Sequence, residues 1–139
     1  IVSEGDLVII ISQSGETADS LAAMRLAKKL GAETLAIVNV KGSSIAREAD
    51  MLIYTHAGPE IAVASTKAYI TQLSVMYLFA FELALAKGTL SEPECKRLIQ
   101  ALMKTPDAVQ YVIENAEEKY TLNISYDSYN NMPKFTIVG

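Results

Sequence analysis

Cysteine and histidine are scarce in this sequence. There is one of each, Cys95 and His56, in 139 residues. A single cysteine excludes an internal disulfide framework and fits a reducing compartment. Cys95 lies in a polar stretch without a histidine beside it, so we interpret it as structural rather than nucleophilic. No run of Cys, Asp or Glu accompanies His56, so no metal site is expected, and no other pattern indicates a cofactor.

The chain also lacks an excess of basic residues. Lys and Arg number 12 and Asp and Glu number 16, which gives a net charge of −4 at pH 7. Without a basic patch to neutralise phosphates along a backbone, no nucleic-acid partner is expected. The N-terminal residues do not show the basic and then apolar pattern of a secretory signal. These absences predict a cytoplasmic protein.

No apolar run is unbroken enough to predict a membrane span. The most apolar segment, residues 68–86, is interrupted by Gln72 and Glu82 and also carries hydroxyl groups. Buried helices of soluble proteins have the same character. We therefore predict a buried helix at 68–86 and no membrane partner.

What the chain does contain is a hydrophobic content of 50%, enough for a real core. The continuous apolar run 7–11 is typical of a strand that is buried on both faces of a parallel sheet. A helix over 17–30 that stops at Gly31, a strand over 34–40, a short helix over 45–48 and a strand over 51–54 follow. This alternation predicts an α/β fold with right-handed crossovers.

A loop rich in hydroxyl groups joins the first strand to the first helix. It contains Ser12, Gln13, Ser14, Gly15 and Thr17. In an open parallel sheet, ligands bind beyond the carboxyl ends of the strands, and a helix N-terminus there favours a phosphate or another small anion. The alternative is an ordinary capping loop that binds nothing. The loop has neither the lysine of an NTPase loop nor the glycine spacing of a dinucleotide loop.

A second junction between a loop and a helix lies at residues 63–67, and it contains Val63 and Ser65. It too is expected at the carboxyl end of a strand, where two hydroxyl-bearing helix starts favour a shared pocket. Alone, it is better explained as a helix cap. His56 borders this pocket or acts catalytically, and the first interpretation is favoured. Glu60 either orients a loop or contacts a sugar, or it is simply solvated.

The C-terminal part of the chain predicts two more helices, from residue 91 to about 104 and from 106 to about 119. The polar segment 120–132 is interpreted mostly as a linker, and 134–139 as a strand. We expect one domain over 1–105, and a helix, linker and first strand of another domain over 106–139. The chain is expected to be truncated at both ends.

Three motifs together carry a resemblance to a known family. They are Ser-Gln-Ser-Gly-Glu-Thr at 12–17, Asn-Val-Lys-Gly-Ser-Ser at 39–44, and the run from Ala57 through Ser-Thr-Lys at 65–67. Over residues 6–88 the chain resembles the sugar isomerase (SIS) domain family. The third motif, followed by Thr71-Gln72-Leu73, is similar to the first of two SIS domains in the glutamine–fructose-6-phosphate aminotransferases.

The resemblance implies a flavodoxin-like, three-layer sandwich with a parallel sheet between helices. It implies that Ser12, Gln13, Ser14 and Thr17 hold the phosphate of a sugar phosphate. It also implies that Val63 and Ser65 line the sugar site. Enzymes of this kind convert fructose 6-phosphate and glutamine into glucosamine 6-phosphate and glutamate. The implied partners are a glutaminase domain, a second SIS domain and a second copy in a homodimer.

Two departures from the family pattern concern this chain. Lys41 stands where relatives often have proline, which affects only a loop. The family's catalytic groups belong to other parts of the enzyme, so no catalytic residue is assigned here and the chain alone is expected to be inactive. Two other functions stay open: a deglycase or isomerase of sugar phosphates, and a non-enzymatic sensor domain of a transcription regulator.

Overall fold

The computed structural model describes residues 1–61, 67–115, 121–126 and 133–138, the last two ranges by their backbone alone. The chain forms two compact units, Ile1–Leu90 and Ser91–Gly139, and each is described by itself. The first unit contains the loops that the sequence marks as a candidate site. The domain boundary predicted at residue 105 stays a prediction.

A parallel sheet forms the centre of the first unit, as predicted. Strands β1 (Leu7–Ser12), β2 (Glu33–Val38) and β3 (Met51–Tyr54) lie in the order β1-β2-β3, and both pairings are parallel. In the register, Val38 is opposite Ser12 on one side and Tyr54 on the other. All three strands therefore end at the same edge, and the loops that follow them are neighbours. The α/β fold is confirmed.

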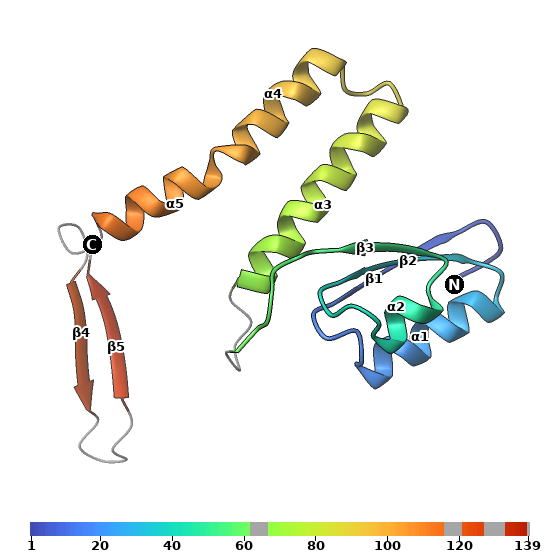
Figure 1. Cartoon of the computed structure of the whole chain (residues 1–139), viewed down its shortest axis with the longest axis horizontal. Coiled ribbons are helices and arrows are strands. Elements are labelled where there is room, and N and C mark those ends of the chain that lie inside the picture. Colours follow the sequence, from blue (N-terminus) through green and yellow to red (C-terminus); the bar gives the residue numbers. More distant parts are fainter. Residues whose placement is uncertain (62–66, 116–120, 127–132, 139) are drawn as a thin grey trace. The chain divides into compact units, whose positions relative to one another are not determined.

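Helices α1 (Ala18–Lys29) and α2 (Ser44–Glu48) lie on the same side of this sheet (Figure 1). Buried side chains from both helices meet alternate residues of β1 and β2, because successive strand residues point to opposite faces. This core cluster comprises Ile10, Met24, Ala36, Val38, Ile45 and Ala46. On β1, Leu7 and Ile11 alternate with the core residues and are 43% and 44% exposed, so the opposite face is only partly covered.

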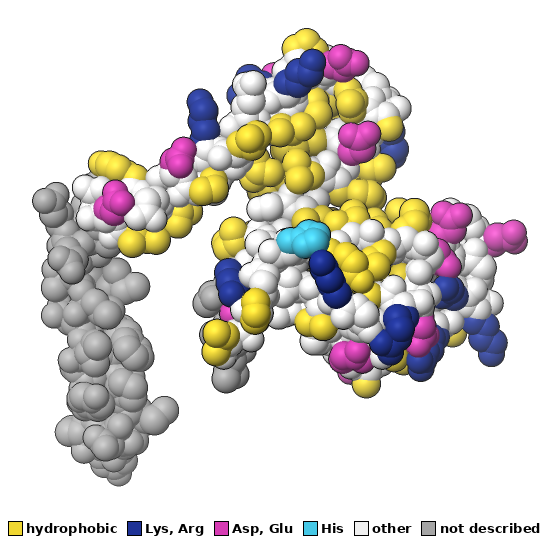
Figure 2. Space-filling view, in the orientation of Figure 1, with side chains coloured by type: hydrophobic (Ala, Val, Ile, Leu, Met, Phe, Trp, Pro, Cys, Tyr) yellow, Lys and Arg dark blue, Asp and Glu magenta, His cyan; other side chains and the backbone are white. Residues whose placement is uncertain are grey.

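Helix α3 (Lys67–Ala86) forms where the sequence predicts a helix, but the prediction that it is buried is wrong for this chain. Ala68 is its one buried residue, and hydrophobic side chains gather along it in the space-filling view (Figure 2). By length and composition alone it could cross a membrane, as could a core helix of a soluble protein. The helix is apolar on every side, so it has no polar face to direct toward solvent.

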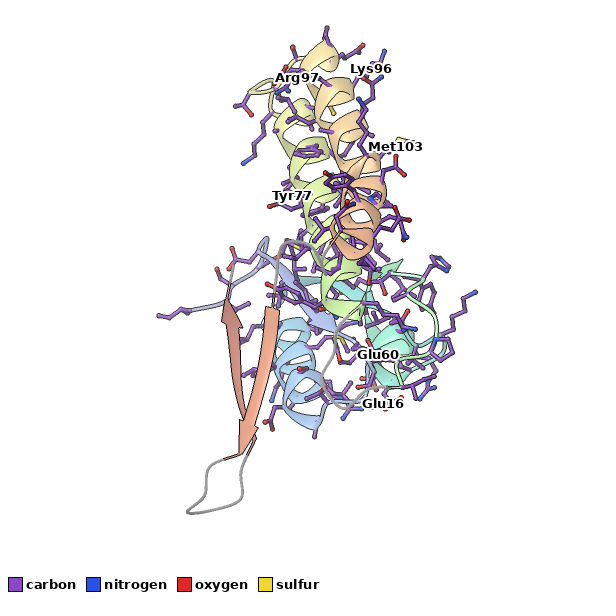
Figure 3. The ribbon with its side chains drawn as sticks, turned by 90° about the vertical axis from the view of Figure 1, so that its left-hand side faces the viewer. Glu16, Glu60, Tyr77, Lys96, Arg97 and Met103 are labelled. Carbon is purple, nitrogen blue, oxygen red and sulfur yellow. The ribbon has the colours of Figure 1, made fainter. Side chains whose placement is uncertain are left out.

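The second unit begins with α4 (Glu92–Met103) and α5 (Thr105–Glu114). The Ser91 hydroxyl accepts a hydrogen bond from Glu94 N at 3.4 Å and so caps α4. Glu94 also pairs at 2.6 Å with Arg97, one turn along the helix, which is labelled in Figure 3. Pro106 lies in the first turn of α5, where its missing N–H costs nothing.

Strands β4 (Thr121–Tyr126) and β5 (Pro133–Val138) pair antiparallel in this unit. The predicted strand at 134–139 is therefore confirmed for residues 134–138, whereas the prediction that 120–132 is mostly a linker is wrong for residues 121–126. The polar composition of that segment obscured a period of two in Leu122, Ile124 and Tyr126, which is a strand signal. The remainder of the predicted linker lies outside the described residues.

Candidate functional site

Three loops meet at the carboxyl edge of the parallel sheet. Gln13, Asn39 and Thr55 are the first residues after β1, β2 and β3. Asn39 N donates to the Gln13 carbonyl at 3.2 Å, and Thr55 N donates to the Val38 carbonyl at 3.0 Å. Two further ladder bonds thus continue past the strand ends and hold the starts of the loops together.

The loop after β1 is organised around the Ser12 hydroxyl. Ser12 is 7% exposed, and its Oγ accepts a hydrogen bond from Gly15 N at 3.0 Å. The same oxygen lies 3.4 Å from Thr17 Oγ1, and Ser14 Oγ accepts from Glu16 N at 3.2 Å. The buried Ser12 hydroxyl therefore helps to hold the backbone of this loop in its observed conformation.

The hydroxyl groups of Ser14 and Thr17 lie at the surface of the same loop. Thr17 is the N-cap residue of α1, with extended backbone, but its side chain makes no capping hydrogen bond. The first N–H groups of a helix have no partner within the helix, and the helix dipole adds positive potential there. Two exposed hydroxyls beside such a helix start can donate to a phosphate or another small anion.

Helix α2 holds this loop from the other side. The Gly15 carbonyl accepts from Ile45 N at 3.0 Å, and Glu16 Oε1 accepts from Ser44 N at 2.8 Å. Hydrogen bonds from Ser44 lower the pKa of Glu16 below its ordinary value. The carboxylate of Glu16 is therefore engaged at the first turn of α2.

A cavity of about 500 Å³ lies beside the loop after β1. Its walls include Gln13, Asn39, Lys41, His56 and Glu60, from the loops that follow β1, β2 and β3. Among the predicted phosphate residues, Gln13 is the one that lines it. Gln13 Oε1 is buried and has no hydrogen-bond partner among the described residues. The hydrogen-bonding capacity of this oxygen is therefore unused among the described residues.

The loop after β3 holds the sequence candidates His56 and Glu60. His56 has a positive φ of 52°, and its ring lies edge-on to that of Tyr54 at 6.1 Å between centroids. Glu60 Oε2 accepts from Ala68 N at 3.3 Å, so this carboxylate binds the first turn of α3 (labelled in Figure 3). Of the alternatives for Glu60, the contact matches the orienting role. Val63 and Ser65, predicted to line the sugar site, lie outside the described residues.

One sequence candidate, Cys95, belongs to the second unit and not to the unit that contains this sheet. Cys95 is 6% exposed on α4, in the second unit. Within the described part of the chain, no group of three or more His, Cys, Asp or Glu is placed to bind a metal ion. The residue that sequence analysis missed is Asn39, whose side chain binds the loop after β3. The strand predicted over 34–40 included Asn39, whereas β2 ends at Val38, so the place of Asn39 in the loop after the strand is seen only in the structure.

Both the sequence and the fold have known relatives. The SIS domain pattern matches residues 1–81. The glutamine–fructose-6-phosphate aminotransferase (isomerizing) of Caldanaerobacter subterraneus subsp. tengcongensis is 57% identical over 117 residues, which are 84% of this chain and 19% of that protein. Its counterpart in Thermococcus kodakarensis is 54% identical over 117 residues, with the same coverage of 84% and 19%. The chain thus spans about a fifth of the length of these curated relatives.

A solved structure has the same arrangement. The C-terminal domain of glucosamine-fructose-6-phosphate aminotransferase from Francisella tularensis superposes with a TM-score of 0.80 at 38% sequence identity. The match covers 85% of this chain and 34% of that domain. Similarity in sequence and similarity in fold therefore indicate the same group of proteins.

Proposed function

The chain belongs to the SIS domain family, and from that premise we propose that it binds a sugar phosphate, with the phosphate group at residues 12–17. The observation that carries the proposal is the pair of exposed hydroxyls, Ser14 and Thr17, at the uncapped start of α1. A phosphomonoester carries close to two negative charges near neutrality. Hydroxyl and backbone donors with a helix dipole neutralise that charge in part without a counter-ion side chain.

The proposed phosphate residues are Ser12, Gln13, Ser14 and Thr17, and they have different tasks. Ser14 and Thr17 offer exposed hydroxyls, whereas Ser12 holds Gly15 N and so preserves the shape of the loop. Gln13 reaches from this loop into the adjoining cavity. The sugar is proposed to contact Val63 and Ser65.

The proposed full activity is that of the relatives: fructose 6-phosphate and glutamine give glucosamine 6-phosphate and glutamate. In that scheme this chain supplies the sugar-phosphate site. A glutaminase domain and a second SIS domain of the same protein supply the remaining chemistry. We further propose a cytoplasmic location and a homodimer. The support is the identity of 57% and 54% to two aminotransferases.

The phosphate site is tested by removing single hydroxyls in the intact protein. Ser14→Ala and Thr17→Ala should each raise the KM for fructose 6-phosphate about tenfold or more. A hydrogen bond to a charged group contributes about 1.5–3 kcal/mol, and 1.4 kcal/mol is a factor of ten. Binding of unphosphorylated fructose, measured by competition, should not change.

The matched control is Ser3→Ala, at the opposite end of the same sheet. The Ser3 hydroxyl is exposed and donates to Asp6 Oδ2 at 3.1 Å, so its loss removes a surface serine hydroxyl far from the proposed site. The KM of this variant should equal that of the wild type. An unaltered KM in both Ser14→Ala and Thr17→Ala would place the phosphate elsewhere.

A further inference from the structure

Asn39 occupies the central position of the carboxyl edge. It follows β2, the middle strand of the three-stranded sheet, so it has a loop on each side. On one side lies the loop after β1, which holds the proposed phosphate residues. On the other side lies the loop after β3, which leads to residues 63 and 65. A residue here can fix the distance between the two loops.

The contacts of Asn39 reach both loops. Its backbone N–H donates to the Gln13 carbonyl at 3.2 Å. Its side-chain Oδ1 accepts from Thr55 Oγ1 at 3.2 Å and from Ala57 N at 2.9 Å, and Nδ2 donates to the Gly58 carbonyl at 2.7 Å. One side chain thus makes three hydrogen bonds to a stretch of four residues.

These contacts need an amide side chain. A carboxylate has two acceptor oxygens but no donor for the Gly58 carbonyl, and an aliphatic side chain has neither donor nor acceptor. The stretch that Asn39 holds includes His56, whose φ of 52° lies in the left-handed region. Non-glycine residues adopt this conformation at a cost, so the surrounding contacts must maintain it.

We infer that Asn39 is a positioning residue, which sets the spacing of the loops after β1 and β3 and so allows one sugar phosphate to contact both. The inference rests on the proposed function. Reacting and binding groups must be held closely in place, because a shift of about 1 Å can cost on the order of a hundredfold. The backbone N–H of Asn39 fixes it to the loop after β1, and its side chain holds the loop after β3 through Thr55, Ala57 and Gly58; Asn39 is not assigned to contact the ligand itself.

A purely structural role for Asn39 predicts a loss of stability without a selective loss of affinity. The matched control is Thr34, near the other end of β2, whose hydroxyl donates to Asp50 Oδ2 at 2.7 Å and accepts from Asp50 N at 3.1 Å. Thr34 is fully buried and braces the amino edge of the sheet as Asn39 braces the carboxyl edge. Thr34→Ala therefore measures how the loss of a buried hydrogen-bonded side chain far from the proposed ligand site affects stability and affinity.

The experiment compares Asn39→Ala and Thr34→Ala in the intact protein, with fructose 6-phosphate and inorganic phosphate as competing probes. Asn39→Ala should weaken fructose 6-phosphate binding at least tenfold and change phosphate binding less than about threefold, because phosphate contacts only the loop after β1. Thr34→Ala should lower the Tm and leave both affinities unchanged. Asn39→Ser, which keeps a side-chain donor and acceptor and adds no charge, should show the same selectivity with a smaller loss of stability.

Other outcomes separate the failure of this inference from that of the proposed function. If Ser14→Ala weakens both probes but neither Asn39 variant weakens fructose 6-phosphate, the positioning role is wrong and the phosphate site stands. Equal weakening of both probes by the Asn39 variants also overturns the positioning role, since the loop after β1 would then be damaged as a whole. If Ser14→Ala weakens neither probe, the proposed function fails.

Discussion

Gly15 lies directly against Ser43. A β-carbon added to Gly15 would be 2.0 Å from Ser43 Oγ and 2.6 Å from Ser43 Cβ. Ser43 is 2% exposed and precedes α2, so it has little room to move. Gly15 also has a φ of +67°, which a side chain disfavours. The loop after β1 can therefore pack on α2 only with glycine at position 15.

Gly15→Ala should destabilise the protein much more than Gly42→Ala. Gly42 has nearly the same φ, +70°, but a β-carbon added there would meet no atom within 4 Å, so its substitution costs only the backbone term of about 1–2 kcal/mol. At Gly15 the clash adds about 1–3 kcal/mol. Denaturant unfolding of both variants gives the difference. Equal losses in the free energy of unfolding would show that Ser43 can move away from the added β-carbon without a cost in stability.

The pH dependence of stability should include a contribution from Asp50. Hydrogen bonds from Lys28 and Thr34 lower the pKa of Asp50 from 3.8 to about 2. A lowered pKa in the folded state means that the stabilisation is complete above the ordinary pKa and is lost as the pH falls from about 4 to about 2. Asp50→Asn should therefore flatten the acid side of the stability curve.

Urea midpoints at pH 7, 4, 3 and 2 measure this effect. Glu33→Gln is the control, because Glu33 is exposed at the start of β2 and its side chain has no hydrogen bond or ion pair among the described residues. Its curve should follow that of the wild type. Parallel acid curves for Asp50→Asn and the wild type would contradict the role of the Lys28 and Thr34 contacts.

Two methionines should differ sharply in their contribution to stability. Met24 on α1 is 0% exposed in the core cluster, whereas Met103 at the end of α4 is 73% exposed (Figure 3). Met24→Ala should lower the free energy of unfolding by about 2–5 kcal/mol, because it removes buried methylenes and leaves a cavity. Met103→Ala should stay within about 0.5 kcal/mol. Calorimetry of the two variants is the measurement, and similar losses would mean that Met103 is covered in solution.

The exposed surface of α3 should bind hydrophobic dyes. Leu73 and Tyr77 are 39% and 55% exposed and line an apolar hollow together with Met76 and Ala80. In a protein of residues 1–139, replacing Leu73 and Tyr77 together by Gln should reduce dye fluorescence, because two apolar groups leave the surface. The Tm should change little. Undiminished fluorescence would place the dye on another surface, such as the open face of β1.

Local patterns in the sequence were sufficient for much of the first unit. The unbroken apolar run of β1, the helical spacing that ends at Gly31, and the strand β3 are properties of neighbouring residues. Such signals act through backbone hydrogen bonds and side-chain direction within one element. The same signals located Ser14 and Thr17 between a strand and a helix, and the structure has them there.

The tertiary structure decided what depends on distant partners. Asn39 binds Gly58, 19 residues along the chain, and Gly15 requires its missing side chain because Ser43 packs on it. Neither partner can be identified from spacing in one element. The prediction that α3 is buried is wrong for the same reason. An apolar composition shows that a helix can be buried, but whether it is buried depends on the elements that pack against it. Local hydrogen bonding and side-chain periodicity can be predicted from neighbouring residues in the sequence. Contacts between loops form only when parallel strands bring their ends to one edge of the sheet.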